Sequence, residues 1–397
     1  EDLDPLGPPR RRLAYDEALA SQLAVAVVRA RRRRLKGRGL KGDGGLRAKA
    51  LAALPFALTA AQTRCAEEIL SDMAEPRRML RLLQGDVGSG KTAVILMAML
   101  GAVEAGAQAA LMAPTEVLAR QHFATLQPLL AQIGVETILL TGRDRGKARA
   151  ALIAALAEGR TKIAIGTHAL LTEDVAFQDL GLAVIDEQHR FGVHQRLLLS
   201  GKNAADGGPP ADVLVSTATP IPRTLLLTGY GDIDVSKVDE KPPGRQRVDT
   251  RALPADRVHD VVEAVGRALD AGDKVYWICP AVEESMTADV AAAEERFRVL
   301  EKRFPGRVGL AHGRLKPAEK DAAMAAFAGR SADGTLIAEA FRTPLLVATT
   351  VVEVGVDAPD ATAIVIEGAE RFGLAQLHQL RGRVGRGAKK SFCILMY

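Results

Sequence analysis

Residues 85–92 read GDVGSGKT and fit the pattern G-x-x-x-x-G-K-[ST], between an apolar run at 79–84 and a helix-forming segment from Lys91 onward. The glycines allow backbone amides to surround phosphate groups, and the start of the helix adds a favourable dipole. Lys91 is expected to neutralise the β- and γ-phosphates of a nucleotide, and Thr92 to offer its hydroxyl to Mg²⁺. The alternative is a glycine-rich turn that only precedes a helix, and the flanking strand and helix disfavour it.

Around this loop, short β-rich runs alternate with helix-length amphipathic segments, which predicts right-handed βαβ units on a parallel sheet. The alternation pauses at a turn-rich loop (203–212) and again at a charged, proline-containing stretch (239–247) typical of an interdomain linker. It then continues to a last strand at 391–397. The expected strands are 79–84, 109–114, 135–140, 162–167, 182–186, 213–219, 274–279, 307–312, 344–349, 362–367 and 391–397. The expected helices are 91–104, 116–132, 146–157, 256–271, 288–303, 317–327 and 374–380.

The length of 397 residues, with 48% hydrophobic and 25% charged residues, is that of a globular protein with more than one domain and excludes a disordered chain. We expect a basic helical segment at 1–50, an α/β domain at 51–238, the linker at 239–247 and a second α/β domain at 248–397. In the first segment, a helix ending in the basic run 31–34 precedes a glycine-rich stretch at 36–45, which we expect to be a mobile loop.

The formal net charge of +5 is unevenly distributed. Residues 1–50 hold 13 Lys and Arg against 6 Asp and Glu, a balance of +7, so the remainder sums to −2. The overall charge therefore does not by itself indicate nucleic-acid binding.

Cysteines and apolar stretches place further limits on the class of protein. Cys65, Cys279 and Cys393 form no CxxC pair, so neither a disulfide framework nor a structural zinc site is expected, which fits a reducing cytoplasm. No apolar stretch reaches the roughly 18 residues of a membrane span. The N-terminus carries no secretory leader, and we expect the chain to be cut from a longer protein.

Two further motifs carry candidate catalytic side chains. DEQH (186–189) follows the buried run LAVI, so Asp186 can hold Mg²⁺ and Glu187 can orient or deprotonate the attacking water. A solvated acidic turn is the alternative, and the preceding phosphate loop disfavours it. In QLRGRVGR (379–386), Arg383 and Arg386 lie on a glycine-interrupted turn that suits arginine fingers, although alone it would be typical of a solvated basic turn. An arginine supplied by the second domain would make hydrolysis depend on domain closure.

These motifs, in their order and spacing, resemble superfamily 2 helicases. Within that superfamily the sequence is similar to the RecG family of bacterial ATP-dependent helicases that act on branched DNA. The resemblance implies two RecA-like domains and extends over residues 52–397. The segments that carry it are PFALTAAQ (55–62), GDVGSGKT, APTEVLARQH (113–122), GTHALL (166–171), DEQHRFGVHQR (186–196), STATPIPRT (216–224), VATTVVEVGVDAPDAT (347–362) and ERFGLAQLHQLRGRVGRG (370–387).

The resemblance also implies roles for individual residues in binding and hydrolysing ATP with Mg²⁺. Gln62 would contact adenine, and Phe56 would either pack nearby or belong to the core. Lys91, Thr92 and Asp186 would hold phosphates and Mg²⁺, and Glu187 would activate water. Gln188 and His189 would sense the γ-phosphate, with a buried, hydrogen-bonded histidine as the alternative for His189. The remaining residues are the loop Gly85, Asp86, Val87, Gly88, Ser89 and Gly90, the second-domain contacts Gly355 and Asp357, the coupling residues Ser216, Thr217 and Thr219, and the closing residues Gln379, Arg383 and Arg386.

One DNA strand would lie across both domains, held mostly by its phosphates through amides, hydroxyls and a few arginines. For each of these residues a surface-loop role is the alternative. The resemblance assigns Pro114, Thr115, Arg120, Thr141, Gly142, Thr167 and His168 in the first domain and His312, Arg314, Thr349 and Thr350 in the second. Aromatic residues are only 4% of the chain, which disfavours base stacking as the main grip.

The sequence also departs from the family pattern. RecG-family helicases carry an N-terminal wedge domain that separates strands at a fork and a C-terminal segment that couples ATP turnover to duplex movement, and neither is found here. We therefore expect a motor core that hydrolyses ATP but unwinds poorly. The stretch 330–344 is longer than usual, and we have no functional account of it.

The function expected is that of a DEQH-box ATPase and helicase or translocase on forks and Holliday junctions, in recombination and repair. We expect a monomer in the bacterial cytoplasm, associated with the nucleoid, whose partners are branched DNA and a single-stranded DNA-binding protein, without a membrane.

A transcription-repair coupling translocase is the nearest alternative, although it more often has an acidic residue in place of Gln188. A primosomal helicase would bring zinc-binding cysteines. A nucleotide-switched DNA-binding module with little turnover is an alternative from another class, and an ATPase unrelated to nucleic acid would leave the second-domain motifs unexplained.

Overall fold

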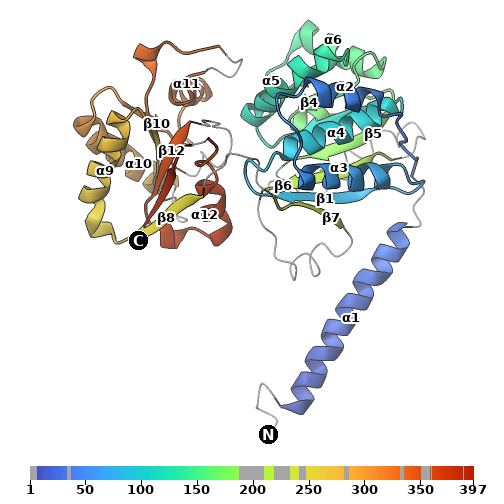
Figure 1. Cartoon of the computed structure of the whole chain (residues 1–397), viewed down its shortest axis with the longest axis horizontal. Helices are drawn as coiled ribbons and strands as arrows, with labels where there is room; N and C mark the ends of the chain where they lie inside the picture. Colours follow the sequence, from blue (N-terminus) through green and yellow to red (C-terminus); the bar gives the residue numbers. More distant parts are fainter. Residues whose placement is uncertain are drawn as a thin grey trace.

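The chain is described here from a computed structural model, which covers residues 7–33, 37–186, 210–218, 233–240, 247–280, 286–330, 335–349, 358, 360–387 and 389–397. Figure 1 shows two α/β domains side by side, with a long N-terminal helix projecting from the first. The expected fold class, two parallel-sheet domains of the RecA-like type preceded by a helix, is confirmed.

The first domain is built on a parallel sheet whose described strands follow the order β3-β4-β2-β5-β6-β1-β7. Successive side chains of its central strands are buried in two hydrophobic clusters, one on each face of the sheet. Leu83, Leu111 and Val184 belong to one cluster, and Leu82, Met112 and Ile185 belong to the other. The strands are β1 (Leu80–Gly85), β2 (Gln108–Met112), β3 (Thr137–Leu140), β4 (Ile163–Gly166), β5 (Leu180–Ile185), β6 (Asp212–Thr217) and β7 (Asp234–Val238).

Helices cover this sheet and include one that is buried on every side. Helix α4 (Lys91–Glu104) is apolar all round because it lies between the sheet and two other helices, α2 (Gly45–Ala53) and α3 (Ala60–Met73). The other described helices of the domain are α5 (Glu116–Gln132), α6 (Gly146–Ala157) and the short 3₁₀ helix η1 (His168–Leu171).

The second domain repeats the design with a parallel sheet in the order β10-β11-β9-β12-β13-β8. Trp277 and Tyr276 on β9 are fully buried on opposite faces of this sheet, and Tyr276 packs against Phe327. The strands are β8 (Val248–Leu253), β9 (Lys274–Ile278), β10 (Val308–Ala311), β11 (Leu345–Ala348), β12 (Ala361–Ile366) and β13 (Ser391–Met396). The helices are α9 (Val258–Asp270), α10 (Met286–Arg303), α11 (Pro317–Ala328) and α12 (Leu374–Arg381), with 3₁₀ turns η4 (Ala255–Arg257), η5 (Glu339–Phe341) and η7 (Ala369–Arg371).

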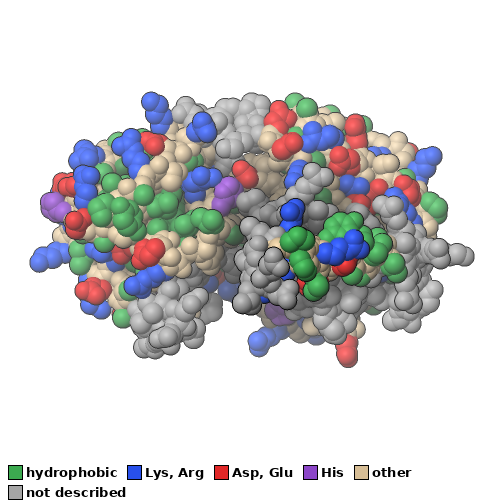
Figure 2. Space-filling view, turned by 90° about the horizontal axis from the view of Figure 1, so that it is seen from below, with side chains coloured by type: hydrophobic (Ala, Val, Ile, Leu, Met, Phe, Trp, Pro, Cys, Tyr) green, Lys and Arg blue, Asp and Glu red, His purple; other side chains and the backbone are tan. Residues whose placement is uncertain are grey.

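The N-terminal segment separates into a free helix and an attached loop. Helix α1 (Pro8–Arg33) exposes every side chain whose burial is described, including Leu13, Tyr15 and Leu23. Figure 2 looks at this helix from below, with apolar side chains gathered along it. Within the glycine-rich stretch after it, residues 37–44 are neither helix nor strand, as expected, but they are fixed to the end of α3. Leu40 is buried and its amide donates to the Met73 carbonyl, and the Gly37 amide donates to the Pro76 carbonyl.

The three cysteines are free and buried, and burial raises the pKa of the Cys65 thiol to about 11 and that of Cys393 to about 12. They are therefore protonated and unreactive near neutral pH. Among the described helices, none combines the length and apolar character that a bilayer span requires. The described part of the chain also contains no group of three or more His, Cys, Asp or Glu side chains arranged to hold a metal.

Asp212 makes the stability of the first domain dependent on pH. It is buried at the start of β6, where Oδ1 accepts from the Met79 amide at 2.7 Å and Oδ2 has no hydrogen-bond partner among the described residues. Burial raises the pKa of this carboxyl from 3.8 to about 7. The native state then binds the proton more tightly than the unfolded chain, so stability falls as pH rises from about 4 to about 7. One pKa unit corresponds to about 1.4 kcal/mol, so the full loss is on the order of 4 kcal/mol.

We expect Asp212→Asn to remove this dependence while keeping an acceptor for Met79. Its unfolding midpoint should exceed that of the wild type at pH 8, and the difference should shrink at pH 5. Thermal unfolding followed by circular dichroism at both pH values measures it, with the exposed Asp256→Asn as control. Equal differences at the two pH values would show that Asp212 ionises normally.

Candidate ATP and nucleic-acid site

The topology places the motifs of the first domain along one edge of its sheet. The phosphate loop follows β1, Asp186 follows β5, and Ser216 and Thr217 end β6, and these three strands are neighbours in the order β5-β6-β1. Because parallel strands end at the same edge, the chemistry-bearing side chains converge there. The loops after β3, β4 and β2 occupy the other half of the same edge.

The phosphate loop has the backbone that its glycines require. Gly88 and Gly90 have φ of 73° and 81°, in the left-handed region that glycine adopts without strain. Lys91 begins α4, and its ammonium donates to the loop's own carbonyls, at 2.6 Å to Gly85 and 3.1 Å to Asp86. The cation and the first amides of α4 therefore face the same small volume, which suits phosphate binding.

Asp186 has the environment of a metal-binding carboxylate. It is 8% exposed, and its Oδ2 lies 2.9 Å from Nε2 of His122. Burial raises the pKa of Asp186, but the hydrogen bond and charge of His122 and the charge of Lys91 outweigh it and hold the pKa below its usual range. The carboxylate is therefore ionised at neutral pH. With the Thr92 hydroxyl it offers the oxygen ligands that Mg²⁺ prefers.

His122 was missed in the sequence as a site residue, although it ends the quoted motif APTEVLARQH. Only the fold brings α5 against the end of β5. A histidine that fixes a ligating carboxylate is a common supporting arrangement around metal sites.

Gln62 ties α3 to the phosphate loop. It is buried in the first turn of α3, where Thr59 and Gln62 form a reciprocal capping box. The side-chain Nε2 donates to the Ser89 carbonyl at 2.9 Å, and a Cβ added at Gly90 would meet the same Nε2 at 2.1 Å. Gln62 therefore lies beside the nucleotide loop. Phe56, by contrast, is 52% exposed, so it does not belong to the hydrophobic core.

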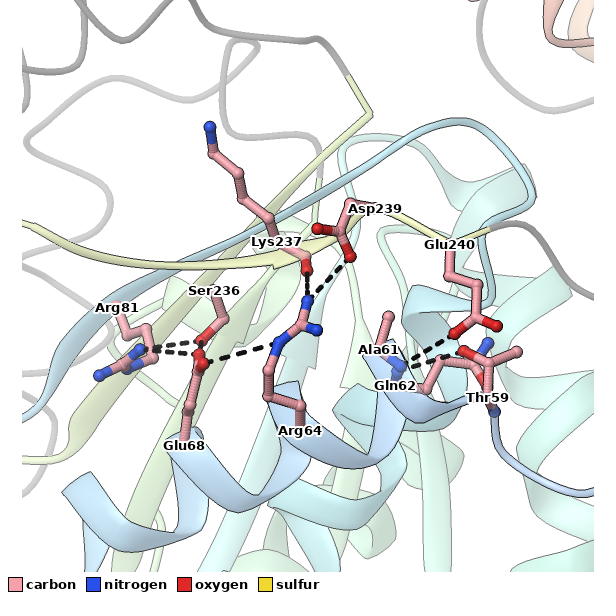
Figure 3. Close-up of polar contacts among 10 residues, drawn as sticks. All are labelled: Thr59, Ala61, Gln62, Arg64, Glu68, Arg81, Ser236, Lys237, Asp239 and Glu240. Atoms are coloured by element: carbon pink, nitrogen blue, oxygen red, sulfur yellow. Dashed lines mark hydrogen bonds and ion pairs between the residues drawn. The ribbon is translucent and has the colours of Figure 1, made fainter.

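The same helix binds the end of β7, where the predicted linker begins (Figure 3). The Ala61 amide donates to Glu240 at 3.1 Å, and Arg64 pairs with Asp239 at 2.8 Å. Further along, Arg81 of β1 donates to Asp72 at 2.6 Å and to the Ser236 hydroxyl at 2.8 Å, and that hydroxyl donates to Glu68. Helix α3 thus joins the phosphate loop to the last residues of the first domain.

This network allows a matched pair of substitutions. The Arg81 side chain is 11% exposed and bonded to three partners, Asp72, Ser236 and Glu68, whereas Arg64 is half exposed. We expect Arg81→Ala to lower the free energy of unfolding by about 2 kcal/mol, because it removes the charged donor that contacts the part-buried Asp72 at 2.6 Å and leaves only Arg77, at 3.8 Å, beside that carboxylate. Arg64→Ala should have a small effect, because exposed pairs contribute little. Urea unfolding of both variants measures the difference, and equal losses would contradict the role given to burial.

The second domain approaches the phosphate loop through α12. His378 Nε2 lies 3.3 Å from Oδ1 of Asp86, and a Cβ added at Gly382 would meet Cβ of Val87 at 2.8 Å. Gln379 is buried, and Nε of Arg386 donates to the Gly382 carbonyl at 3.2 Å. The turn that carries Arg383 and Arg386 therefore lies beside the phosphate loop of the other domain.

The residues assigned to DNA lie after β2, β3 and β4 in the first domain and after β10 and β11 in the second. Their accessibility divides them into three groups. Gly142, His168 and Arg314 are exposed, and Pro114, Thr115 and Arg120 are half-buried. The side chains of Thr141, Thr167, His312 and Thr349 are buried.

Three of these four buried side chains are hydrogen-bonded within the protein. The Thr141 hydroxyl donates to Asp144, the Thr167 hydroxyl accepts from the Ala169 amide, and Nδ1 of His312 accepts from the Arg314 amide. These side chains shape loops, and a strand would meet the backbone around them. Arg120 donates to Glu116 at 2.8 Å. Arg143 pairs with the same Glu116 and with Asp321 of the second domain, at 3.1 Å each.

Some predicted residues lie outside the described part of the chain, so their placement stays a prediction. They are Glu187, Gln188, His189, Thr219, Thr350, Gly355 and Asp357.

Comparison with known proteins identifies relatives of this chain. A DEAD/DEAH box helicase model matches residues 59–227, and a helicase conserved C-terminal domain model matches residues 257–388. The chain is 49% identical over 392 residues to the ATP-dependent DNA helicase RecG of Escherichia coli (strain K12), and 46% identical over 390 residues to that of Bacillus subtilis (strain 168). In both cases the match covers 98% of this chain and 55% of the relative. Over 98% of its length the chain is similar to RecG.

A solved structure of RecG bound to a three-way DNA junction has a TM-score of 0.79 and 43% identity with this chain, and the match covers 98% of it and 49% of that chain. Mss116p bound to ssRNA and AMP-PNP, at 17% identity, shares the fold alone, with a TM-score of 0.68 over 89% of this chain and 72% of that one. The chain thus spans about half the length of its RecG-family relatives, and that half contains both helicase domains.

Proposed function

We propose that this chain is the ATP-driven motor of a DNA helicase or translocase that acts on branched DNA, such as forks and Holliday junctions, in recombination and repair. The observation that carries the proposal is the contact of α12 with the phosphate loop, at 3.3 Å between His378 and Asp86. It puts Arg383 and Arg386 of one domain beside the nucleotide loop of the other. Such a composite site hydrolyses ATP only when the domains close.

In this mechanism the residues act at both ends of the nucleotide. Gln62 reads the base, and Lys91 and the loop amides bind the phosphates. Asp186, held ionised by His122, and Thr92 bind Mg²⁺, which supplies charge neutralisation at the phosphates when bound. Arg383 and Arg386 stabilise the charge that develops on the transferred phosphoryl group.

Further residues, which apart from Ser216 and Thr217 lie outside the described ranges, complete the proposal. Glu187 activates the attacking water, and Gln188 and His189 sense the γ-phosphate, as in a DEQH box. Gly355 and Asp357 contact nucleotide from the second domain. Ser216, Thr217 and Thr219 couple the nucleotide state to the grip on DNA.

DNA lies across the loops after β2, β3 and β4 and reaches those after β10 and β11. Phosphate contacts dominate, so binding is independent of base sequence and weakens with salt. We further propose that the protein works as a monomer in the bacterial cytoplasm, on the nucleoid, with a single-stranded DNA-binding protein as partner.

An ATPase assay without DNA, with linear duplex and with a three-way junction tests the function. We expect stimulation by DNA, strongest with the junction. Turnover that no DNA stimulates would instead indicate an ATPase unrelated to nucleic acid, and tight nucleotide-dependent DNA binding without turnover would indicate a switched binding module. Equal stimulation by duplex and junction would favour a transcription-repair type of translocase.

Strand displacement on a model fork tests the second part of the proposal. We expect this chain to hydrolyse ATP but to unwind poorly compared with a form extended at both ends to the length of its relatives. Equal unwinding by the two forms would show that the motor alone is sufficient.

A further inference from the structure

The contact between α12 and the phosphate loop falls on two positions that the motif G-x-x-x-x-G-K-[ST] leaves free. Asp86 and Val87 are the first two variable residues of GDVGSGKT. Their side chains are not needed to wrap phosphate, because that task belongs to the backbone amides. Both contact the same turn of the second domain.

Hydrogen bonding defines the tautomer of His378. Nη2 of Arg381 lies 3.1 Å from Nδ1 of His378, and a guanidinium can only donate. Nδ1 is therefore the acceptor, and in the neutral ring the proton is on Nε2. That proton points to Oδ1 of Asp86 at 3.3 Å, so the imidazole donates to a carboxylate across the domain boundary.

Close packing adds a steric component beside this bond. At Gly382 an added Cβ would lie 2.8 Å from Cβ and 3.0 Å from Cγ2 of Val87, a distance too short for a side chain to fit unchanged. Since φ at Gly382 is −67°, glycine is required here by space and not by backbone conformation. The end of α12 therefore lies directly against the phosphate loop.

The docked turn also holds an arginine finger. Gly382, which touches Val87, accepts from Nε of Arg386 at 3.2 Å through its carbonyl. His378 and Gly382 lie four residues apart, one turn of α12, and so face the same side. The contacts that hold His378 and Gly382 on the phosphate loop therefore also hold the backbone from which the Arg386 side chain extends.

We propose that Asp86 and His378 form a latch that docks α12 on the phosphate loop and so positions Arg383 and Arg386 for hydrolysis. Both are positioning residues, since they act through the arginines. This inference rests on the proposed ATP hydrolysis and assigns a docking role to side chains that phosphate binding leaves unused.

Steady-state ATPase kinetics of His378→Ala, Asp86→Ala and the double variant, with saturating three-way junction DNA, test the latch. Each single variant should lose about tenfold in kcat, as expected for one hydrogen bond to a charged group, with KM for ATP changed less than twofold. The double variant should lose no more than either single one. His378→Gln, which keeps a donor at the same end of the side chain, should recover most of the rate.

Two controls separate docking from general damage. In an Arg383→Ala/Arg386→Ala background, His378→Ala should cost nothing further, because both arginines that it positions are gone. The exposed His259→Ala on α9 should match the wild type. Additive losses in the double variant, a loss confined to KM, or no rescue by glutamine would overturn the proposal.

A second readout does not depend on turnover. Because the three native cysteines are buried, fluorophores can be attached to cysteines introduced at the exposed positions Lys147 and Lys302, one in each domain. A non-hydrolysable ATP analogue should raise energy transfer in the otherwise unchanged chain and much less in Asp86→Ala. If the unaltered chain closes but hydrolyses no ATP, the proposed function fails while the latch stands. Closure by Asp86→Ala equal to that of the unaltered chain would refute the latch.

Discussion

Replacing Lys91 with alanine should lower DNA-stimulated ATP turnover by about 10³-fold or more, as the removal of a preorganised charge from a phosphoryl-transfer site does. The ammonium is held by the loop's own carbonyls at 2.6 and 3.1 Å, at the start of α4. Both kcat and the affinity for ATP should fall, because in the proposed mechanism Lys91 contacts the phosphates before and during the reaction. A coupled ATPase assay with saturating junction DNA measures the first effect and fluorescent-nucleotide titration the second.

The matched control for this variant is Lys49→Ala, which removes an exposed lysine from α2. It should retain wild-type turnover. If Lys91→Ala did so as well, the phosphate loop would not be the nucleotide site and the proposed function would be wrong.

Arg386→Ala should also lower turnover by about 10³-fold, the effect of an arginine finger, but it should leave ATP affinity nearly unchanged. The reason is its position on the second domain, where it reaches the phosphates only through the turn docked by His378 and Gly382. The contrast with Lys91→Ala is therefore a large loss in kcat without a loss in nucleotide binding. Single-turnover hydrolysis together with nucleotide titration separates the two.

Arg371→Ala is the control, because it removes an exposed arginine from the same domain. Wild-type turnover by Arg386→Ala would show that the site is not shared between the domains.

The alternating sheet architecture could be predicted because the buried strands are continuous apolar runs with helix-length segments between them. The strands that were missed, β7 and β8, lie at sheet edges and carry polar or exposed residues, so they leave no apolar run to find. Helix α3 was missed although Thr59 and Gln62 give a capping-box signal at its start.

The sequence could indicate a nucleotide site because the residues that suggest it are local, in one loop and at one strand end, and their roles stay predictions. The contacts of His122 with Asp186 and of His378 with Asp86 could not be predicted, since each joins segments that meet only in the fold. For the residues assigned to DNA, the sequence indicates the segments but not the orientation of the side chains. Motif similarity indicates the loops, whereas only the structure shows that the side chains of Thr141 and His312 face inward.

Helix α1 also has a mechanical consequence. Its 26 residues make a rod of roughly 39 Å, so a rotation of about 10° at its base moves its far end by about 7 Å. The chain that follows is bonded to the end of α3 at Met73 and Pro76, while the start of α3 is bonded to the phosphate loop through Gln62. A movement of α1 that displaces residues 37–40 would therefore act on the end of α3 opposite to the one bonded to the phosphate loop.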